Sequence, residues 1–184
     1  SIYLILKYKI NFVMCFGGYV SLPVGLAAWI CRKPLFLHEQ NTVIGTSNKI
    51  LLRFAKNIFL GFPVNSIQEK NMILVGNPIK NRTKRKSSFK DTRPLRIYVT
   101  GGSQGSEYIN LNIPAAINSL NRSIEVRHQT GIGKSKGIKE RYSHQIAVEI
   151  AEFYDSPQDS LVWSDFIISR AGALSLSEAM SLKR

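Results

Sequence analysis

Acidic residues are scarce in this 184-residue sequence, and the scarcity is uneven. There are 12 Asp and Glu residues against 25 Lys and Arg, which gives a formal net charge of +13. The first sixty residues hold seven basic residues and a single acid, Glu39, and the segment from Lys80 to Arg96 holds eight basic residues and one acid. Such an excess attracts phosphates, anionic lipid headgroups or nucleic acid. For the segment around Lys84, a solvated linker is the favoured interpretation.

Cysteines and long apolar runs are also few. Cys15 and Cys31 lack metal-ligand spacing, which favours free buried thiols in a reducing compartment over a disulfide. The segment from Ile10 to Cys31 contains no charged residue and is long enough to span a bilayer, but it is interrupted by Gly17-Gly18 and by Pro23. This punctuation predicts a buried strand, a tight loop and a new helix.

Short apolar segments rich in β-branched residues alternate with segments of helical length. The predicted strands are 12–16, 34–38, 58–60, 73–75, 96–100, 124–128, 148–153 and 166–168, and the predicted helices are 22–30, 47–55, 107–120 and 174–182. Nearly continuous apolar strands alternating with helices are typical of parallel sheets covered on both faces. We therefore predict an α/β fold with two incomplete Rossmann-like domains, at 1–79 and 95–184, joined by a basic linker at 80–94.

In open parallel sheets, ligands bind beyond the carboxyl ends of the strands. The predicted strand 96–100 runs into Gly101-Gly102-Ser103-Gln104-Gly105 ahead of a helix. Glycines let the backbone approach a ligand, and the N–H groups at a helix start suit a phosphate. The context favours a phosphate site over a plain turn, although the sequence is neither a Walker loop nor a complete dinucleotide-binding fingerprint.

A second loop of small residues follows the strand 166–168 and begins with Arg170. Its amides near Ala173, with Ser175 beside them, could bind a sugar or phosphate oxygen, and Glu178 is placed to accept hydrogen bonds from a vicinal diol such as a ribose. Ser175 and Glu178 also match a helix capping box. The spacing alone supports both interpretations equally.

Two further loops follow strands in the first half of the chain. His38-Glu39-Gln40-Asn41 places four polar side chains after a buried strand, where they need hydrogen bonds or a function. Gly17-Gly18-Tyr19 could contact a diphosphate or simply turn. His38 has no second ligand at metal-binding spacing, and His128, alone at a strand end, is predicted to be a core or capping residue.

These loops, in this order, resemble the MurG family, the undecaprenyldiphospho-muramoylpentapeptide β-N-acetylglucosaminyltransferases. The matching stretches are Phe16-Gly17-Gly18-Tyr19-Val20-Ser21, His38-Glu39-Gln40-Asn41, Gly76-Asn77-Pro78-Ile79-Lys80, Gly101-Gly102-Ser103-Gln104-Gly105 and Arg170-Ala171-Gly172-Ala173. They span nearly the whole chain.

The resemblance implies a GT-B fold whose second domain holds the donor, UDP-N-acetylglucosamine. It implies that Ser103 and its glycine loop contact the donor diphosphate, and that Tyr154 stands where the family uses a backbone contact to the uracil. It places Glu178 at the ribose hydroxyls and Asn41 at the donor sugar, across the cleft from the first domain. The stretch from the helix start would contact the sugar and phosphate: Ala173, Leu174, Ser175, Leu176 and Ser177.

Two positions depart from the family pattern. Lys80 stands where Arg is common, which keeps the charge but loses the planar fork for a bidentate contact. Pro157 stands where a methionine is expected. No cofactor or metal is implied.

The implied reaction is an inverting transfer of N-acetylglucosamine to the 4-hydroxyl of undecaprenyl-pyrophosphoryl-N-acetylmuramoyl-pentapeptide, with UDP leaving toward helix N-termini. The basic, apolar first half would dock to anionic lipid, as a peripheral protein on the cytoplasmic side of the bacterial inner membrane. A glycine-rich loop with the candidate catalytic base is expected before Ser1, and Gln-containing strands are expected after Arg184. The isolated chain is therefore expected not to turn over.

Three alternatives remain open at this point. The chain could be another GT-B glycosyltransferase or a UDP-sugar epimerase, a basic module that binds nucleic acid, or an inactive truncated product. Binding to nucleic acid is not expected, because the chain lacks the interleaved aromatic and basic pattern and the usual motifs.

Overall fold

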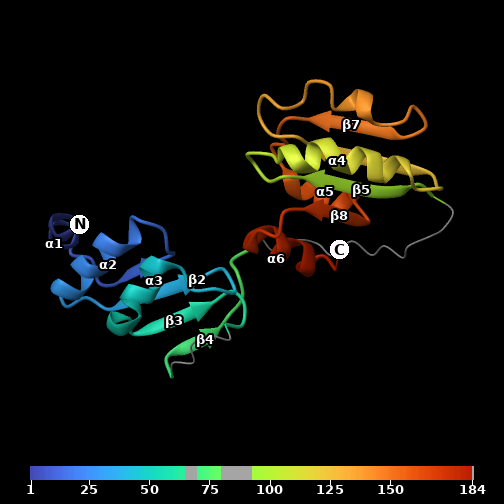
Figure 1. Ribbon diagram of the computed structural model, residues 1–184. Coiled ribbons are helices and arrows are strands. Elements are labelled where there is room, and N and C mark those ends of the chain that lie inside the picture. Colours follow the sequence, from blue (N-terminus) through green and yellow to red (C-terminus); the bar gives the residue numbers. More distant parts are fainter. Residues whose placement is uncertain (65–69, 80–92, 184) are drawn as a thin grey trace. The chain divides into compact units, whose positions relative to one another are not determined.

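The computed structural model describes residues 1–64, 70–79 and 93–183 (Figure 1). The chain divides into two compact units, Ser1–Lys80 and Asn81–Arg184. Each unit is built around one four-stranded sheet in which every strand pair is parallel. Parallel neighbours require crossover connections, which explains the alternation of strands and helices in the sequence.

The sheet of the first unit has the order β1-β2-β3-β4. Its strands are β1 (Val13–Cys15), β2 (Leu35–Glu39), β3 (Asn57–Leu60) and β4 (Met72–Leu74). Its helices are α1 (Ile2–Lys7), α2 (Ser21–Ile30), α3 (Thr46–Leu51) and the 3₁₀ turn η1 (Leu52–Phe54). The segment Ile10–Cys31 thus forms a strand, a loop and a helix, as predicted. No described helix is long and apolar enough to cross a membrane.

The core of the first unit lies between its sheet and α2 with α3. Leu35 and Leu37 on β2 and Ile58 on β3 are nearly inaccessible to solvent and pack against Leu51 of α3. Alternate residues of the same strands, Phe36 among them, point to the opposite face, as the two-residue period of a strand requires.

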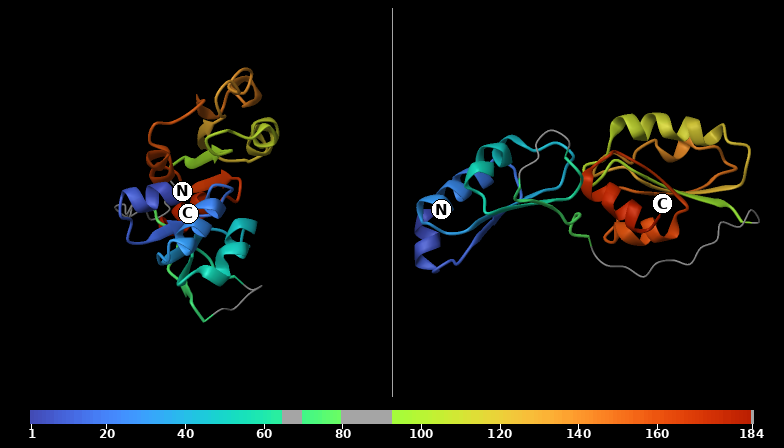
Figure 2. Two further views of the ribbon diagram at one scale, coloured as in Figure 1. Left: turned by 90° about the vertical axis from the view of Figure 1, so that its left-hand side faces the viewer. Right: turned by 90° about the horizontal axis from the view of Figure 1, so that it is seen from below.

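The sheet of the second unit has the order β7-β6-β5-β8. Its strands are β5 (Leu95–Thr100), β6 (Ile124–Gln129), β7 (Ala147–Ala151) and β8 (Phe166–Ser169). Its helices are α4 (Glu107–Asn118), α5 (Pro157–Trp163), α6 (Ala173–Ser181) and the 3₁₀ turn η2 (Lys139–Arg141). Figure 2 shows α4 on one face of this sheet and α5 with α6 on the other.

Strand order in the second sheet reverses between β5 and β8, which are neighbours although three crossovers separate them in the chain. In open α/β sheets such a reversal opens a crevice beyond the carboxyl ends of the two strands, because their following helices leave on opposite faces. The loops after β5 and β8 therefore meet where ligands bind in this architecture.

An ion pair joins the start of the second unit to the turn before β8. The Arg93 guanidinium donates to both carboxylate oxygens of Asp165, at 2.7 and 2.6 Å, and the backbone N–H of Arg96 donates to the same carboxylate. The Asp165 side chain is only 4% exposed. The last residues of the predicted linker segment are thus bonded to the turn before β8.

Candidate nucleotide-sugar site

The glycine-rich loop after β5 is held in a shape that only glycine allows at two positions. Gly102 and Gly105 have φ values of +81° and +69°, in the left-handed region. A side chain on Gly101 would overlap the backbone of Ser106, and the Gly102 N–H donates to Thr100 Oγ1 at 3.0 Å. The loop therefore passes close over the end of β5.

The free donors of this loop lie in its middle. Among the described residues, no hydrogen bond uses the backbone N–H of Ser103 or of Gln104. The Gly105 N–H bonds back to Gly102, and Ser106 caps α4 by accepting from the Ile109 N–H at 3.5 Å. Because α4 is capped by its own side chain, the loop amides rather than the first turn of α4 are available to an anion.

Helix α6 differs because no side chain caps it. Its N-cap is Gly172, and Leu176 makes the first intrahelical bond, to the Gly172 carbonyl. Ser175 is the third residue of the helix, so the capping-box interpretation of Ser175 and Glu178 is wrong. In the described part of the chain, the N–H groups of Ala173 to Ser175 stay unpaired, and they carry the positive end of the helix dipole.

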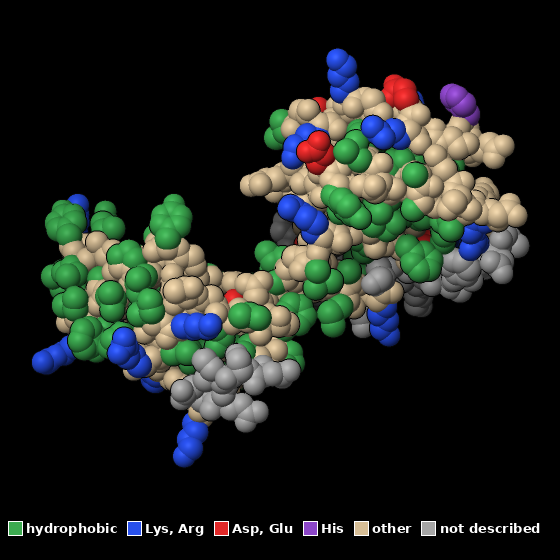
Figure 3. All heavy atoms as spheres, in the orientation of Figure 1, with side chains coloured by type: hydrophobic (Ala, Val, Ile, Leu, Met, Phe, Trp, Pro, Cys, Tyr) green, Lys and Arg blue, Asp and Glu red, His purple; other side chains and the backbone are tan. Residues whose placement is uncertain are grey.

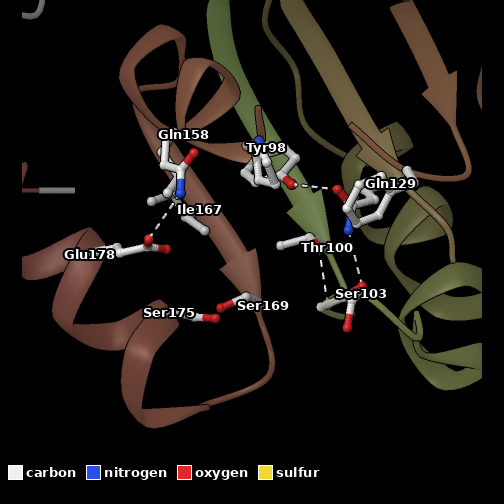
Figure 4. A pocket seen from close by; sticks show the side chains of 13 residues that line it. Tyr98, Thr100, Ser103, Gln129, Gln158, Ile167, Ser169, Ser175 and Glu178 are labelled. Carbon is white, nitrogen blue, oxygen red and sulfur yellow. Dashed lines mark hydrogen bonds between the residues drawn. The ribbon is translucent and has the colours of Figure 1, made fainter. Parts of the chain in front are cut away.

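Both loops border one pocket, which we call the β5–β8 pocket (Figure 4). Figure 4 shows Ser175 and Glu178 on α6 facing Tyr98, Thr100 and Ser103 across it. The pocket is lined by Tyr98, Thr100, Gly102, Ser103, Gln129, Phe153, Pro157, Gln158, Leu161, Ile167, Ser169, Ser175 and Glu178. Its volume is about 170 Å³, below the roughly 300–1,000 Å³ of sites that enclose a drug-sized ligand. It would therefore hold one part of a larger molecule.

Three polar residues of the pocket escaped the sequence analysis. Tyr98 and Gln129 lie on its floor, and the Tyr98 hydroxyl donates to Gln129 Oε1 at 3.1 Å. Gln158 on α5 donates to Glu178 Oε1 at 3.4 Å. Gln129 ends β6, so the strand-end rule that selected the other loops could have found it. Gln158 gave no such signal, because α5 itself was not predicted.

The remaining candidates of this unit lie after β7, at the start of α5, in the loop after β8 and on α6. Tyr154 follows β7 and donates its backbone N–H to Gln129 Oε1 at 3.4 Å. Pro157 begins α5 at a position where its missing N–H costs no helical bond. Arg170 lies over the glycine loop, because a Cβ on Gly102 would be 3.4 Å from its Nη2 atom. Leu174 and Leu176 are exposed, and Ser177 bonds back to the Ala173 carbonyl.

The loop after β2 in the first unit is organised by a buried carboxylate. Glu39 is 2% exposed, and its two oxygens accept from the Asn41 N–H and amide, the Gly45 N–H and the Asn48 amide at 2.9–3.1 Å. Burial alone would raise the pKa of Glu39, but the hydrogen bonds from Gly45, Asn48 and Asn41 outweigh it and lower the pKa below its ordinary value. Both carboxylate oxygens of Glu39 thus have hydrogen-bond donors within its own loop and the following helix.

The other strand-end loops of this unit gather around the same place. Gln40 Nε2 donates to the Phe16 carbonyl at 3.2 Å, and Asn77 Nδ2 donates to the Gln40 carbonyl at 3.1 Å. His38 Nε2 is 3.2 Å from the Gly76 carbonyl. Gly17 and Gly18 have φ values of +84° and +77°, while Tyr19 is 89% exposed. The three family-like stretches of the first unit therefore form one connected edge.

His128 belongs to the core, as predicted. It is fully buried; its Nε2 lies 3.0 Å from Asn110 Oδ1, and its Nδ1 lies 3.0 Å from the Tyr142 hydroxyl. Burial lowers the pKa of His128 to about 4, so the ring is neutral at pH 7. An amide oxygen can only accept, so Nε2 carries the proton and Nδ1 accepts from Tyr142.

The predicted site residues are thus only partly brought together. Ser103, Ser175 and Glu178 line one pocket, whereas Asn41 belongs to the other unit, and Lys80 lies outside the described residues. Within residues 1–64, 70–79 and 93–183, no three His, Cys, Asp or Glu side chains are grouped as metal ligands would be.

Family models match both units. The model of the glycosyltransferase family 28 N-terminal domain matches residues 1–60, and that of the family 28 C-terminal domain matches residues 96–184. The two matches together cover more than half of the chain, which therefore belongs to glycosyltransferase family 28.

Within this family the chain groups with MurG proteins. It is 37% identical over 173 residues to the UDP-N-acetylglucosamine--N-acetylmuramyl-(pentapeptide) pyrophosphoryl-undecaprenol N-acetylglucosamine transferase of Aeromonas hydrophila, covering 90% of this chain and 47% of that protein. It is 38% identical over 188 residues to the protein of the same name from Coxiella burnetii, covering 97% of this chain and 52% of the other.

Solved structures agree with this grouping. The crystal structure of Acinetobacter baumannii MurG superimposes with a TM-score of 0.79 at 31% identity, over 96% of this chain and 52% of that one. The Staphylococcus aureus MnaA–UDP co-structure, at 14% identity and a TM-score of 0.57, covers all of this chain and 58% of that one and shares the fold alone. The fold is thus of the GT-B type, and the chain spans about half the length of the curated relatives it matches.

Proposed function

We propose that the second unit binds the donor UDP-N-acetylglucosamine for transfer of N-acetylglucosamine to a lipid-linked N-acetylmuramoyl-pentapeptide. The main support is that Ser103 and Ser175, one from each of the two sets of unpaired N–H groups, both line the pocket that also contains Glu178. Backbone amides at a glycine loop and at a helix N-terminus suit a diphosphate.

The second unit offers hydrogen-bond acceptors for the ribose and for the uracil of the donor. The Glu178 carboxylate can accept hydrogen bonds from the two ribose hydroxyls. The Tyr154 N–H already donates to Gln129, so the Tyr154 carbonyl is the backbone group left to accept from the N3–H of uracil. Ser103 and the α6 amides would hold the diphosphate between these ends and the sugar.

The proposed reaction is an inverting displacement. The 4-hydroxyl of the muramoyl sugar attacks the anomeric carbon of N-acetylglucosamine, while the bond from that carbon to the β-phosphate oxygen breaks and UDP leaves. The loop and helix amides stabilise the negative charge that develops on the departing diphosphate. The described residues assign no general base for the hydroxyl proton. Within the first unit, Asn41 donates its side-chain amide to Glu39, and its side-chain carbonyl oxygen remains an acceptor.

Titration calorimetry of the chain with UDP, UDP-N-acetylglucosamine and CDP tests the donor site. We expect UDP and UDP-N-acetylglucosamine to bind and CDP to bind more weakly, because cytosine lacks the N3–H donor. Equal affinities for UDP and CDP would contradict the proposed base contact, and no binding of either UDP ligand would overturn the proposed function.

The first unit offers a surface for an anionic membrane. Helix α1 packs on the end of α2 through Ile5, Ala27 and Ala28. Four apolar side chains of α1 and α2 stay outside this contact, each more than half exposed: Tyr3, Leu6, Trp29 and Ile30. Lys7, Arg32 and Lys33 lie beside them in the sequence, and Figure 3 shows apolar side chains gathered at this end of the unit with basic ones at the margin. Amphipathic surfaces with basic margins bind anionic lipid.

Vesicle flotation tests this surface with phosphatidylglycerol against phosphatidylcholine. We expect binding to anionic vesicles that is weakened by Leu6→Ser with Trp29→Ser. Tyr108→Ser with Ile132→Ser removes comparable exposed apolar surface from the second unit and serves as the control. Equal binding to both vesicle types would contradict the membrane proposal.

A further inference from the structure

One buried carboxamide connects three segments of the β5–β8 pocket. Gln129 is 2% exposed at the carboxyl end of β6. Its Nε2 donates to the Gly102 carbonyl at 3.0 Å, and its Oε1 accepts from the Tyr98 hydroxyl at 3.1 Å and from the Tyr154 N–H at 3.4 Å. Figure 4 shows Gln129 and Tyr98 joined on the floor of the pocket.

The orientation of the Gln129 amide follows from its partners. A carbonyl can only accept and a backbone N–H can only donate, so the amide nitrogen must face Gly102 and the amide oxygen must face Tyr154. With the amide reversed, Oε1 would face the Gly102 carbonyl, so that two acceptors meet. Nε2 would then face the Tyr154 N–H, so that two donors meet. The side chain therefore has one stable position.

In this position the side chain connects Gly102 to Tyr154. The proposed function assigns these two segments to the diphosphate and to the base of one ligand. Gly102 is held through its N–H by Thr100 and through its carbonyl by Gln129, and it directly precedes Ser103 at the proposed diphosphate contact. Tyr154 carries the proposed base contact and is held by the same side chain.

We propose that Gln129 is a positioning residue that fixes the spacing between the diphosphate-binding loop and the base-binding segment. The inference rests on the proposed function, because it assumes that a uridine diphosphate spans these two segments. Gln129 itself would act through Gly102 and Tyr154. A ligand that spans both segments gains from their fixed spacing, whereas a fragment that touches one segment does not.

The test compares UDP with uridine and with inorganic pyrophosphate on the unaltered chain and on Gln129→Met. Methionine keeps the length of the side chain and adds no charge, but it removes all three hydrogen bonds. We expect UDP to bind about tenfold more weakly to Gln129→Met, while the affinities for uridine and for pyrophosphate change less than about twofold. The same substitution at an exposed glutamine, Gln145→Met, is the control and should leave all three affinities unchanged.

Each outcome decides between distinct conclusions. Absence of UDP binding by the unaltered chain overturns the proposed function and this inference together. UDP binding that Gln129→Met leaves unchanged overturns the inference alone. A parallel loss for UDP, uridine and pyrophosphate also overturns it, because that result indicates general disruption of the pocket.

A second variant covers the case in which Gln129→Met does not fold, as judged by circular dichroism. Tyr98→Phe removes one donor to Gln129 Oε1 and leaves the carboxamide in place. We expect about a threefold loss in UDP affinity, consistent with one hydrogen bond between neutral groups, and no change for uridine. Unchanged UDP affinity in Tyr98→Phe would then refute the positioning role.

Discussion

Gly105 and Gly131 pack backbone against backbone, so that a Cβ on Gly131 would lie 2.6 Å from the Gln104 carbonyl oxygen and one on Gly105 would overlap the Thr130 carbonyl. This contact joins the glycine loop after β5 to the turn after β6. Both residues also have positive φ values, +69° and +91°. The loop is thus positioned by contact with its neighbour as well as by its own conformation.

Gly105→Ala is expected to destabilise the second unit by at least about 3 kcal/mol, because backbone strain and overlap add. Gly133→Ala is the matched control, since Gly133 also has a positive φ, +72°, but nothing lies near its missing Cβ. The control should lose about 1 kcal/mol from φ strain alone. Urea unfolding monitored by Trp163 fluorescence, in a Trp29→Phe background, measures both. Similar losses in the two variants would contradict the packing argument.

Glu178→Gln is expected to weaken UDP binding about 10- to 100-fold, because hydrogen bonds to a charged acceptor are stronger than those to a neutral amide. Glu140→Gln makes the same change of charge at an exposed residue of η2 and should leave the affinity unchanged. Calorimetry with UDP measures both variants. An unaltered affinity in Glu178→Gln would remove Glu178 from the proposed site.

The second unit should lose stability in mild acid through His128. The folded pKa is about 4 and the ordinary value is 6.5, so the unfolded chain binds the proton first as the pH falls. The contribution of neutral His128 to the free energy of unfolding is therefore fully present above pH 6.5. It falls by about 3 kcal/mol as the pH drops from 6.5 through 4. Unfolding curves across this range should show a smaller acid-dependent decline in His128→Gln than in the unaltered chain. His144→Gln, at an exposed histidine, should retain the full decline.

Glu39→Gln should destabilise the first unit by about 2 kcal/mol, because one carboxylate oxygen becomes an N–H donor that faces other donors. Asn48→Ala removes one of those donors together with its bond to the His38 carbonyl, and should cost about 1–2 kcal/mol. Trp29 fluorescence in a Trp163→Phe background follows this unit. Since the pKa of Glu39 is lowered, its contribution is present at neutral pH and is lost as the pH falls through the folded value. Equal stability of Glu39→Gln and the unaltered chain would contradict the role of the carboxylate in the loop.

The sequence was sufficient to predict every strand of both sheets, because buried parallel strands are short, apolar and bounded by glycine or polar residues. The bounds moved by one or two residues; the strand predicted at 148–153, for example, is β7 at Ala147–Ala151. Helix α3 was predicted to run to Ala55 but ends at Leu51 and continues as a 3₁₀ turn.

Helices α1 and α5 were not predicted, each for a physical reason. α1 leaves Tyr3, Leu4 and Leu6 exposed, so its sequence lacks the polar face that marks an amphipathic helix. α5 spans seven residues and follows a loop that contains Asp155 and Ser156, too short for a periodic signal.

The candidate site was accessible to sequence reasoning only through its loops. Glycines and polar residues at strand ends pointed to Ser103 and Glu178, which line one pocket. Tyr98 lies within β5, where a polar residue reads as part of the sheet, whereas Gln129 ends β6 and was accessible to the strand-end rule. Whether Ser175 caps α6 depended on where the helix begins, and local spacing does not fix that start.

Among the described residues, β8 pairs with β5 and with no other strand. Its outer margin presents backbone amides and carbonyls beside Phe166, which is 55% exposed. Such a margin accepts a strand from another molecule. A further strand, from this chain or from another one, would therefore extend the sheet of the second unit at β8, next to Phe166.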